Sequence, residues 1–216
     1  MKLIVLSHPK KQDEEIKYFV QLFESGLEFL HIRKPGFSKT ALEKIISQIP
    51  AQYYNRIIIH SHYSLAQKYG LKGIHFTYHV FKKRIKSRLI FNYLRLLNPK
   101  MHISASFHRL SELQTDKRNY NYVFLSPVFK SFSKINYSAT FSDYSLKMAM
   151  NNATCNVIAL GGVDHSRVEK ILELGFDGMA VLGSIWRSDK PMEEFIAIQN
   201  KIKQCCTTLA SPAPTT

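Results

Sequence analysis

VIALGGV at residues 157–163 and GMAVLGSIW at residues 178–186 decide the fold of this chain. Each stretch begins as a short apolar run typical of a buried strand and reaches glycine where the strand would end, and a helix-like segment at residues 164–176 connects the two. Glycine-bearing strand ends near the C-terminus are typical of the phosphate pocket after the seventh and eighth strands of a (β/α)8 barrel. Glycine lets the backbone approach an anion, and exposed N–H groups donate to phosphate oxygens. The two stretches therefore predict a barrel enzyme whose ligand carries a phosphate.

Further apolar runs precede this unit and alternate with amphipathic stretches. Strands are predicted at residues 3–7, 28–34, 56–61, 73–77, 102–108 and 122–129, and helices at residues 13–25, 38–48, 63–69, 142–151, 164–175 and 191–204. Near-continuous apolar strands separated by helices indicate a parallel sheet buried on both faces. Residues 78–99 are strongly basic and do not predict a clean fourth helix. We predict an α/β protein with a single (β/α)8 TIM barrel over residues 1–206, followed by a disordered C-terminal tail at residues 207–216.

Charge and composition narrow the partners and the location. The formal net charge is +14, and residues 44–111 contain no Asp or Glu. Half of the basic residues of that stretch lie within residues 82–95, which we interpret as a solvated helix or loop face; no nucleic-acid partner is expected, because no reader motif accompanies it. No apolar run approaches the roughly 20 residues of a membrane span, so no membrane partner is expected either. Cys155, Cys205 and Cys206 form neither a disulfide framework nor a zinc spacing, which favours the cytoplasm, and a homo-oligomer stays open.

The active site of such a barrel lies at the C-terminal ends of the strands. The side chains and glycines expected there are Arg33, Lys34, His60, His62, His75, Ser106, His108, Ser131, Ser133, Lys134, Gly161, Gly162, Gly183 and Ser184. Cations, imidazoles and hydroxyls dominate and carboxylates are absent, so the rim suits an anionic ligand. His108 is a candidate acid or base, because imidazole titrates near neutral pH. A metal site made by His60, His62, His75 and His108 is a lesser alternative, and we predict no bound metal from these residues.

These strand ends, in this order, resemble the thiamine phosphate synthase family and its relative, the thiazole tautomerase. Seven stretches carry the resemblance, each similar to one family motif. They are LHIRKP (30–35) to Q-L-R-x-K, IIIHSHYSLA (57–66) to I-N-D-x-x-x-L-A, GIHF (73–76) to G-V-H-L, SASFHRLSEL (104–113) to V-S-x-H-s-x-x-E, YNYVFLSPVFKSFSK (120–134) to D-Y-v-x-x-G-P-v-f-x-T-x-T-K, ALGGV (159–163) to A-I-G-G-I and GMAVLGSI (178–185) to G-v-A-V-v-S-a-I. The resemblance extends from about Leu3 to Trp186. It implies a cytoplasmic enzyme of thiamine biosynthesis whose partners are phosphorylated thiazole and pyrimidine molecules.

The resemblance also implies roles for individual residues. The synthase joins a hydroxymethylpyrimidine diphosphate to a thiazole phosphate with Mg²⁺ and releases pyrophosphate. Phosphate roles fall on Gly162 and on the turn at Gly183 and Ser184, with Gly161 beside them. Contacts with the diphosphate fall on Arg33, Ser106, Ser131, Ser133 and Lys134. Apart from the resemblance, the place of His60 and His75 at strand ends makes them further candidates for binding substrate. His108 and Lys34 are the implied catalytic residues.

The family's metal-binding positions are the main departure. The Asp of I-N-D falls on Ser61 and its Asn on His60, a second Asp falls near Val80, and the Lys of Q-L-R-x-K falls on Pro35, although Lys34 could replace it. Mg²⁺ prefers hard oxygen ligands, so Mg²⁺ is expected only if the chain is a true synthase. Two alternatives stay open. One is a metal-independent thiazole tautomerase, an isomerase that uses His108 as acid and base, and the other is a non-catalytic binder of thiamine phosphates.

Overall fold

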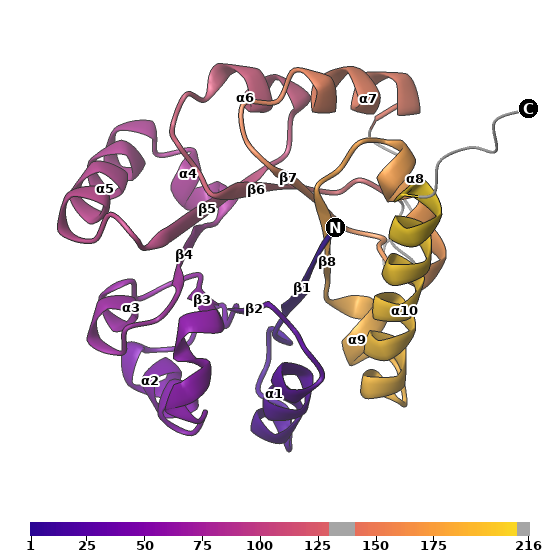
Figure 1. Cartoon of the computed structure of the whole chain (residues 1–216). Helices are drawn as coiled ribbons and strands as arrows, with labels where there is room; N and C mark the ends of the chain where they lie inside the picture. The colour runs from indigo at the N-terminus through magenta and orange to yellow at the C-terminus, as the bar shows by residue number, and fades with distance from the viewer. Residues whose placement is uncertain (130–140, 211–216) are drawn as a thin grey trace, which may run out of the picture.

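The computed structural model describes residues 1–129 and 141–210, and within them eight parallel strands close into a barrel in sequence order (Figure 1). The strands are β1 (Lys2–Leu6), β2 (Phe29–Ile32), β3 (Ile57–Ile59), β4 (Gly73–Phe76), β5 (His102–Phe107), β6 (Tyr122–Leu125), β7 (Val157–Leu160) and β8 (Gly178–Val181). The first strand pairs with the last in the register Lys2↔Gly178, which closes the barrel. The predicted (β/α)8 barrel is confirmed, and each predicted strand is found within its predicted range or one residue beyond it.

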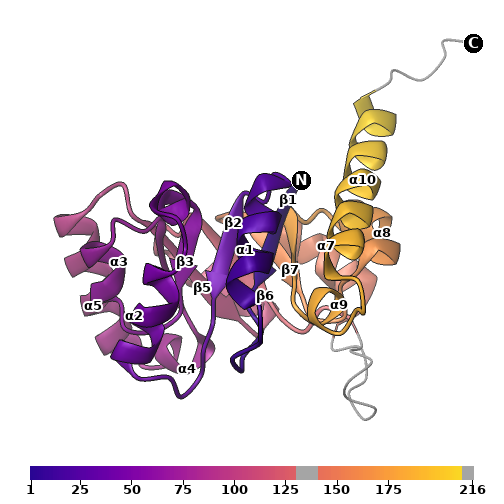
Figure 2. The same ribbon diagram turned by 90° about the horizontal axis from the view of Figure 1, so that it is seen from below.

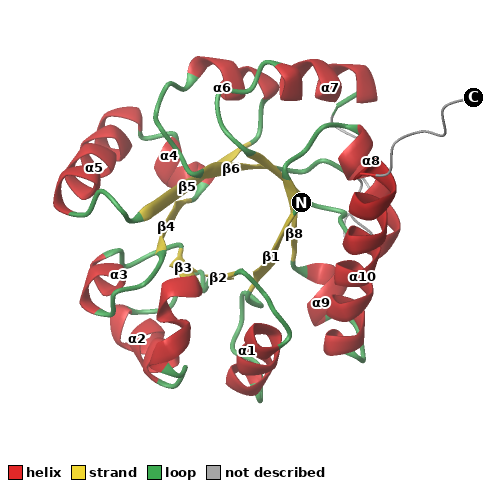
Figure 3. Cartoon of the chain, viewed as in Figure 1, coloured by secondary structure: helices red, strands yellow, loops and turns green. Residues whose placement is uncertain are grey.

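Helices form an outer ring around the strands (Figure 3). They are α1 (Glu15–Glu24), α2 (Lys39–Ser47), α3 (Ser64–Lys68), α4 (Tyr78–Phe81), α5 (Arg84–Leu97), α6 (Leu110–Thr115), α7 (Asp143–Asn151), α8 (Val168–Glu173), α9 (Gly183–Trp186) and α10 (Pro191–Ala210), with 3-10 turns η1 (Ala51–Arg56) and η2 (His165–Arg167). Seen from the side, α10 extends past the end of the barrel at which the chain begins (Figure 2). None of the helices in the described ranges is long and apolar enough to cross a membrane.

Three predicted helix starts are confirmed by side-chain caps. The hydroxyl of Ser38 accepts a hydrogen bond from the backbone N–H of Ala41 at 3.1 Å, and the hydroxyl of Ser142 accepts one from Ser145 at 3.2 Å. The carboxylate of Asp164 accepts one from the N–H of Ser166 at 2.9 Å. Each bond satisfies a donor that the first turn of a helix leaves without an intrahelical partner.

The strands bury both faces, which gives two hydrophobic cores. The larger core fills the space between the strands and the helices, and the smaller core fills the inside of the barrel. The inner core consists of Ile4, Leu6, Phe29, Ile58, Tyr122, Phe124, Ile158 and Ala180. Alternate residues of a strand point to opposite faces, so His31, two residues after Phe29 on β2, also lies inside the barrel, with its ring 4.9 Å from that of Phe124.

Two expectations about segment boundaries need correction. Residues 78–99 contain the short α4 and the long helix α5, where the sequence predicts no clean helix. The reason is tertiary: Phe91 and Leu94 are buried against the barrel, and the guanidinium of Arg95 donates to the carbonyl of Met101 at 3.0 Å. The last helix continues to Ala210, past its expected end near Gln204, so the first residues of the predicted tail are helical. Residues 211–216 lie outside the described part of the chain.

Candidate active site

A cavity of about 1470 Å³ opens at the C-terminal ends of the strands. Its lining includes Arg33, Lys34, His60, Ser106, His108, Gly161, Gly162, Gly183 and Ser184, all of them predicted site residues. His75 lies beneath the lining and is fully buried. Ser131, Ser133 and Lys134, the predicted phosphate clamp, lie outside the described residues. The structure therefore brings the described part of the predicted site to one end of the barrel.

The glycine-ended strands β7 and β8 form one side of this cavity. Gly161 follows β7 with φ +93°, a conformation that residues with a Cβ rarely adopt, and a Cβ there would lie 3.0 Å from Pro127. At Gly183 a Cβ would meet the guanidinium of Arg187 at 2.7 Å. The hydroxyl of Ser184 is buried without a hydrogen-bond partner among the described residues. This side therefore combines close backbone approach, a cation and an unpaired hydroxyl, the groups that bind phosphate.

Arg187 is a further functional candidate, which the sequence alone does not predict. It follows the four-residue helix α9, and its Nε donates to the carbonyl of Gly183 at 3.2 Å. Nothing local distinguishes this arginine in the sequence, because only the turn of α9 returns its side chain to Gly183.

Arg33 lies on the same cavity rim, directly after β2, which is separated from β8 only by β1. Its backbone N–H donates to the hydroxyl of Ser7 at 2.9 Å, and that hydroxyl contacts the carbonyl of Arg33 at 3.2 Å. This reciprocal contact ties the end of β2 to the end of β1. Burial lowers the pKa of Arg33 from its usual value. The guanidinium stays a cation, because the usual pKa of arginine lies far above neutral pH.

The ammonium of Lys34 makes structural contacts within the protein. Its ammonium donates to the carbonyls of His8 at 2.8 Å and Lys10 at 2.9 Å, and it forms an ion pair with Glu15 of α1. Burial lowers the pKa of Lys34 and raises the pKa of Glu15, against their mutual attraction. All three donors of the ammonium thus hold the loop between β1 and α1, and the catalytic role of Lys34 stays a prediction.

His108 lies at the end of β5 with one ring nitrogen fixed. Its Nδ1 hydrogen-bonds the carbonyl of Ser126, and since a carbonyl only accepts, Nδ1 carries the hydrogen. The backbone N–H of His108 donates to Glu112 at 2.8 Å, and the ring packs edge-on against Tyr78. Nε2 of the neutral ring is therefore an acceptor, which suits a base beside the cavity.

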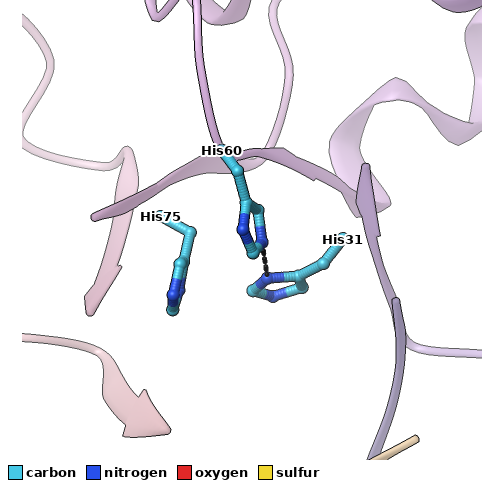
Figure 4. A group of neighbouring side chains, drawn as sticks. All are labelled: His31, His60 and His75. Atoms are coloured by element: carbon cyan, nitrogen blue, oxygen red, sulfur yellow. Dashed lines mark hydrogen bonds between the residues drawn. The ribbon is translucent and has the colours of Figure 1, made fainter. Parts of the chain in front are cut away.

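Three imidazoles meet inside the barrel beneath the cavity (Figure 4). Nδ1 of His31 on β2 lies 2.9 Å from Nε2 of His60, which follows β3, and the ring of His60 stacks on that of His75 from β4 at 4.3 Å. Burial is the largest cause that lowers the pKa of each ring, well below the usual value for His31 and His60 and to about 3 for His75. The charge of Arg33 lowers the pKa of His60 and His75 further. The three rings are neutral at pH 7.

His60 and His75 are predicted site residues, whereas His31, which stands in the middle of an apolar strand, is not predicted from the sequence. His62, the third rim histidine of the sequence-based metal site, adopts φ +51° and donates from Nε2 to the carbonyl of Phe37 at 2.8 Å. It therefore does not join the cluster of His31, His60 and His75.

The residues of the cavity do not fit Mg²⁺. Ser61 and Val80, on which the resemblance places the family's metal-binding residues, both line the cavity. The carboxylates in the described lining belong to Asp164 and Glu194, of which the first caps η2 and the second pairs with His165 at 3.1 Å. Mg²⁺ requires oxygen ligands in near-octahedral geometry. Ser61 and Val80 supply no carboxylate to it.

Fold and cavity together define a (β/α)8 barrel with a cavity lined by cations, glycines and hydroxyls at the carboxyl ends of its strands. The family model described as "Thiamine monophosphate synthase" matches residues 2–185, and the chain belongs to this family.

Two curated relatives illustrate the distance within the family. The thiamine-phosphate synthase of Shouchella clausii is 23% identical over 182 residues, which are 82% of this chain and 83% of that relative. The thiamine-phosphate synthase of Prochlorococcus marinus is 24% identical over 208 residues, 94% of this chain and 56% of that relative.

Solved structures agree on the fold. The thiamine phosphate pyrophosphorylase of Bacteroides thetaiotaomicron superposes with a TM-score of 0.74 and 28% identity, covering 98% of this chain and 100% of that one. The thiamine phosphate pyrophosphorylase of Pyrococcus furiosus superposes with a TM-score of 0.75 at 16% identity, covering 94% of this chain and 96% of that one.

Proposed function

We propose that this protein is a thiamine phosphate synthase that neutralises its diphosphate substrate with arginine instead of Mg²⁺. The observation that carries the proposal is two cations that line one cavity: Arg187, with the unpaired Ser184 hydroxyl beside Gly183, and Arg33 after β2. The groups around Gly183 suit the phosphate of a thiazole, and Arg33 suits the diphosphate of a hydroxymethylpyrimidine. The names of the curated relatives support the same reaction.

In this reaction the C–O bond between the pyrimidine methylene and the diphosphate breaks, and pyrophosphate leaves with the electron pair. The thiazole nitrogen then forms a C–N bond to the methylene carbon. Arg33 stabilises the charge that develops on the leaving oxygens, because a preorganised cation in a partly buried site acts without reorganisation of solvent. Neither step releases a proton, so the reaction requires no base, and the catalytic role of His108 stays a prediction.

The test incubates the purified protein with both substrates, in Mg²⁺ and in excess EDTA, and measures thiamine phosphate and pyrophosphate. We expect product in both conditions. Arg33→Met should lower kcat by about 10²- to 10³-fold, the usual cost of removing one group that stabilises transition-state charge. Arg88→Met, a matched change on the exposed surface of α5, should leave kcat unchanged. Strict dependence on Mg²⁺ would contradict the arginine mechanism, and binding without product would contradict synthase activity altogether.

A further inference from the structure

An exposed apolar stripe runs along α5, the helix at the outer left edge of the ring in Figure 1. Its members Ile85, Leu89, Tyr93 and Leu96 are 80%, 64%, 61% and 81% exposed. Residues at these spacings share one face of a helix, so the four side chains are neighbours. Of the eight large hydrophobic residues exposed in the described part of the chain, five lie on this helix. The apolar stripe is therefore a concentrated surface and not scattered exposure.

The apolar stripe is not the face by which α5 packs on the barrel. Phe91 and Leu94 are buried on the opposite face of the helix. Ser87 on that face is fully buried and accepts a hydrogen bond from Arg118 at 2.9 Å, and Arg118 is itself paired with Asp116. The helix thus already has one buried face, and the described chain leaves the second apolar face uncovered.

The charged side chains in this part of the chain are cations, because residues 44–111 contain no Asp or Glu. Lys82 and Lys83 precede α5, and Lys86 lies in its first turn. All three lysines are exposed, and none of them forms an ion pair within the described residues. The apolar stripe therefore borders on positive charge that no carboxylate of the described residues neutralises.

The position of the lysines is unfavourable for the helix itself. The N-terminal end of a helix carries partial positive charge and is stabilised by acidic side chains. The first turn of α5 contains no acidic residue, and its N-cap, Lys83, makes no side-chain capping hydrogen bond. The lysines therefore do not serve the stability of α5, and a negatively charged surface at this end would offset their repulsion.

We propose that α5 binds the surface of an anionic phospholipid membrane, with the helix axis in the plane of the membrane. The apolar stripe enters the boundary between headgroups and acyl chains, and the three lysines contact the anionic headgroups. The sequence predicts no membrane partner because no apolar run is long enough to span a bilayer, but a helix that lies on the surface needs no such run. None of these residues lines the cavity, so the membrane surface is separate from the candidate active site.

A second copy of the chain is the competing occupant of the apolar stripe. A symmetric dimer places each surface against its own copy, so the lysines beside one α5 would face those beside the other. An interface of this kind lacks charge complementarity. Nucleic acid would match the lysines, but its phosphates leave the aliphatic side chains of the stripe without a partner. An anionic membrane matches both the charge and the apolar surface.

Vesicle sedimentation with the purified full-length protein tests the proposal. We expect binding to vesicles of phosphatidylcholine mixed with phosphatidylserine, much weaker binding to phosphatidylcholine alone, and dissociation at high salt. The double variant Leu89→Gln and Leu96→Gln should lose binding and keep the wild-type melting temperature, because both side chains are exposed. Ile196→Gln, a matched change at an exposed position of α10, should bind as the wild type does.

Two further variants separate charge from insertion. Lys83→Gln with Lys86→Gln should weaken binding by about 25-fold, at about fivefold for each cation near an anionic surface. Lys147→Gln with Lys203→Gln, at exposed positions of α7 and α10, is the matched control and should not weaken binding to this extent. Leu89→Trp keeps the stripe apolar, and its fluorescence should shift to shorter wavelength when anionic vesicles are added. The single native tryptophan lines the cavity and supplies the baseline.

Three results would overturn the proposal. The first is equal binding to both kinds of vesicle, or binding to neither. The second is vesicle binding that survives Leu89→Gln with Leu96→Gln, which would show a purely electrostatic surface of the kind that binds nucleic acid. The third is a dimer in analytical ultracentrifugation that the same substitutions convert to a monomer, which would assign the stripe to a second copy. No substrate is present in these measurements, so the membrane proposal and the synthase activity fail independently.

Discussion

The three buried imidazoles predict that the fold is unusually sensitive to acid. A histidine in an unfolded chain has a pKa of about 6.5, whereas burial lowers the pKa of His31 and His60 well below this and that of His75 to about 3. Below pH 6.5 the unfolded state therefore binds protons that the folded state does not. Their contribution to stability is complete above that pH and is lost as the pH falls.

The size of the effect follows from proton linkage. Each histidine that stays neutral in the folded state lowers the free energy of unfolding by about 1.4 kcal/mol for every pH unit below its unfolded pKa. The three rings together cost about 4 kcal/mol per unit, which is comparable to the lower end of the roughly 5–15 kcal/mol that stabilises a typical domain. His102, whose pKa burial lowers to about 4, contributes to the same slope.

The assay is urea unfolding at a series of pH values between 7 and 4.5, for the wild type and for His60→Asn. The variant removes one titrating group, so the slope of its unfolding free energy against pH should be smaller by about 1.4 kcal/mol per unit. Carboxylates affect both proteins equally, and any loss of packing shifts the curve without changing its slope. His79→Asn, at an exposed histidine, should keep the wild-type slope. Parallel curves for the wild type and His60→Asn would refute the reasoning.

Three further changes test the architecture around the site. Lys34→Met leaves the buried carboxylate of Glu15 without its cation and should destabilise the fold by about 3–5 kcal/mol in chemical denaturation, with partial recovery in the double variant Lys34→Met and Glu15→Leu. Gly178→Ala places a Cβ 2.6 Å from the carbonyl of Lys2 at the seam that closes the barrel and should cost about 1–3 kcal/mol; an unchanged melting temperature would contradict this close approach. Ser38→Ala removes the cap of α2 and should lower the free energy of unfolding by about 1 kcal/mol in chemical denaturation.

The strand ends were predictable because their signals are local. Short apolar runs that end in glycine, proline or polar residues indicate where buried strands stop, and parallel strands place all those ends on one rim. That rule alone brings His108 and Gly161 to the same cavity. Caps at Ser38 and Ser142 were predictable for the same reason, since a cap bonds a backbone group only a few residues away.

His31 and Lys34 show where local signals end. Leu30, His31 and Ile32 are all at most 1% exposed, so burial does not distinguish the face of β2 that lines the barrel from the face that meets the helices. The environment of Lys34 depends on Glu15, which belongs to a different element. α5 is stabilised by the burial of Phe91 and Leu94, which its basic sequence does not predict.

The sequence by itself determined the barrel and the rim of cations, imidazoles and hydroxyls, which follow from residue type, periodicity and order along the chain. Its resemblance to the family implied that Ser61 and Val80 stand where metal-binding carboxylates are expected. Only the tertiary structure decided that His31 meets His60 and His75 inside the barrel, beneath the cavity. The physical reason is closure of the sheet, which turns one face of every strand inward and brings neighbouring strands into hydrogen-bonding contact.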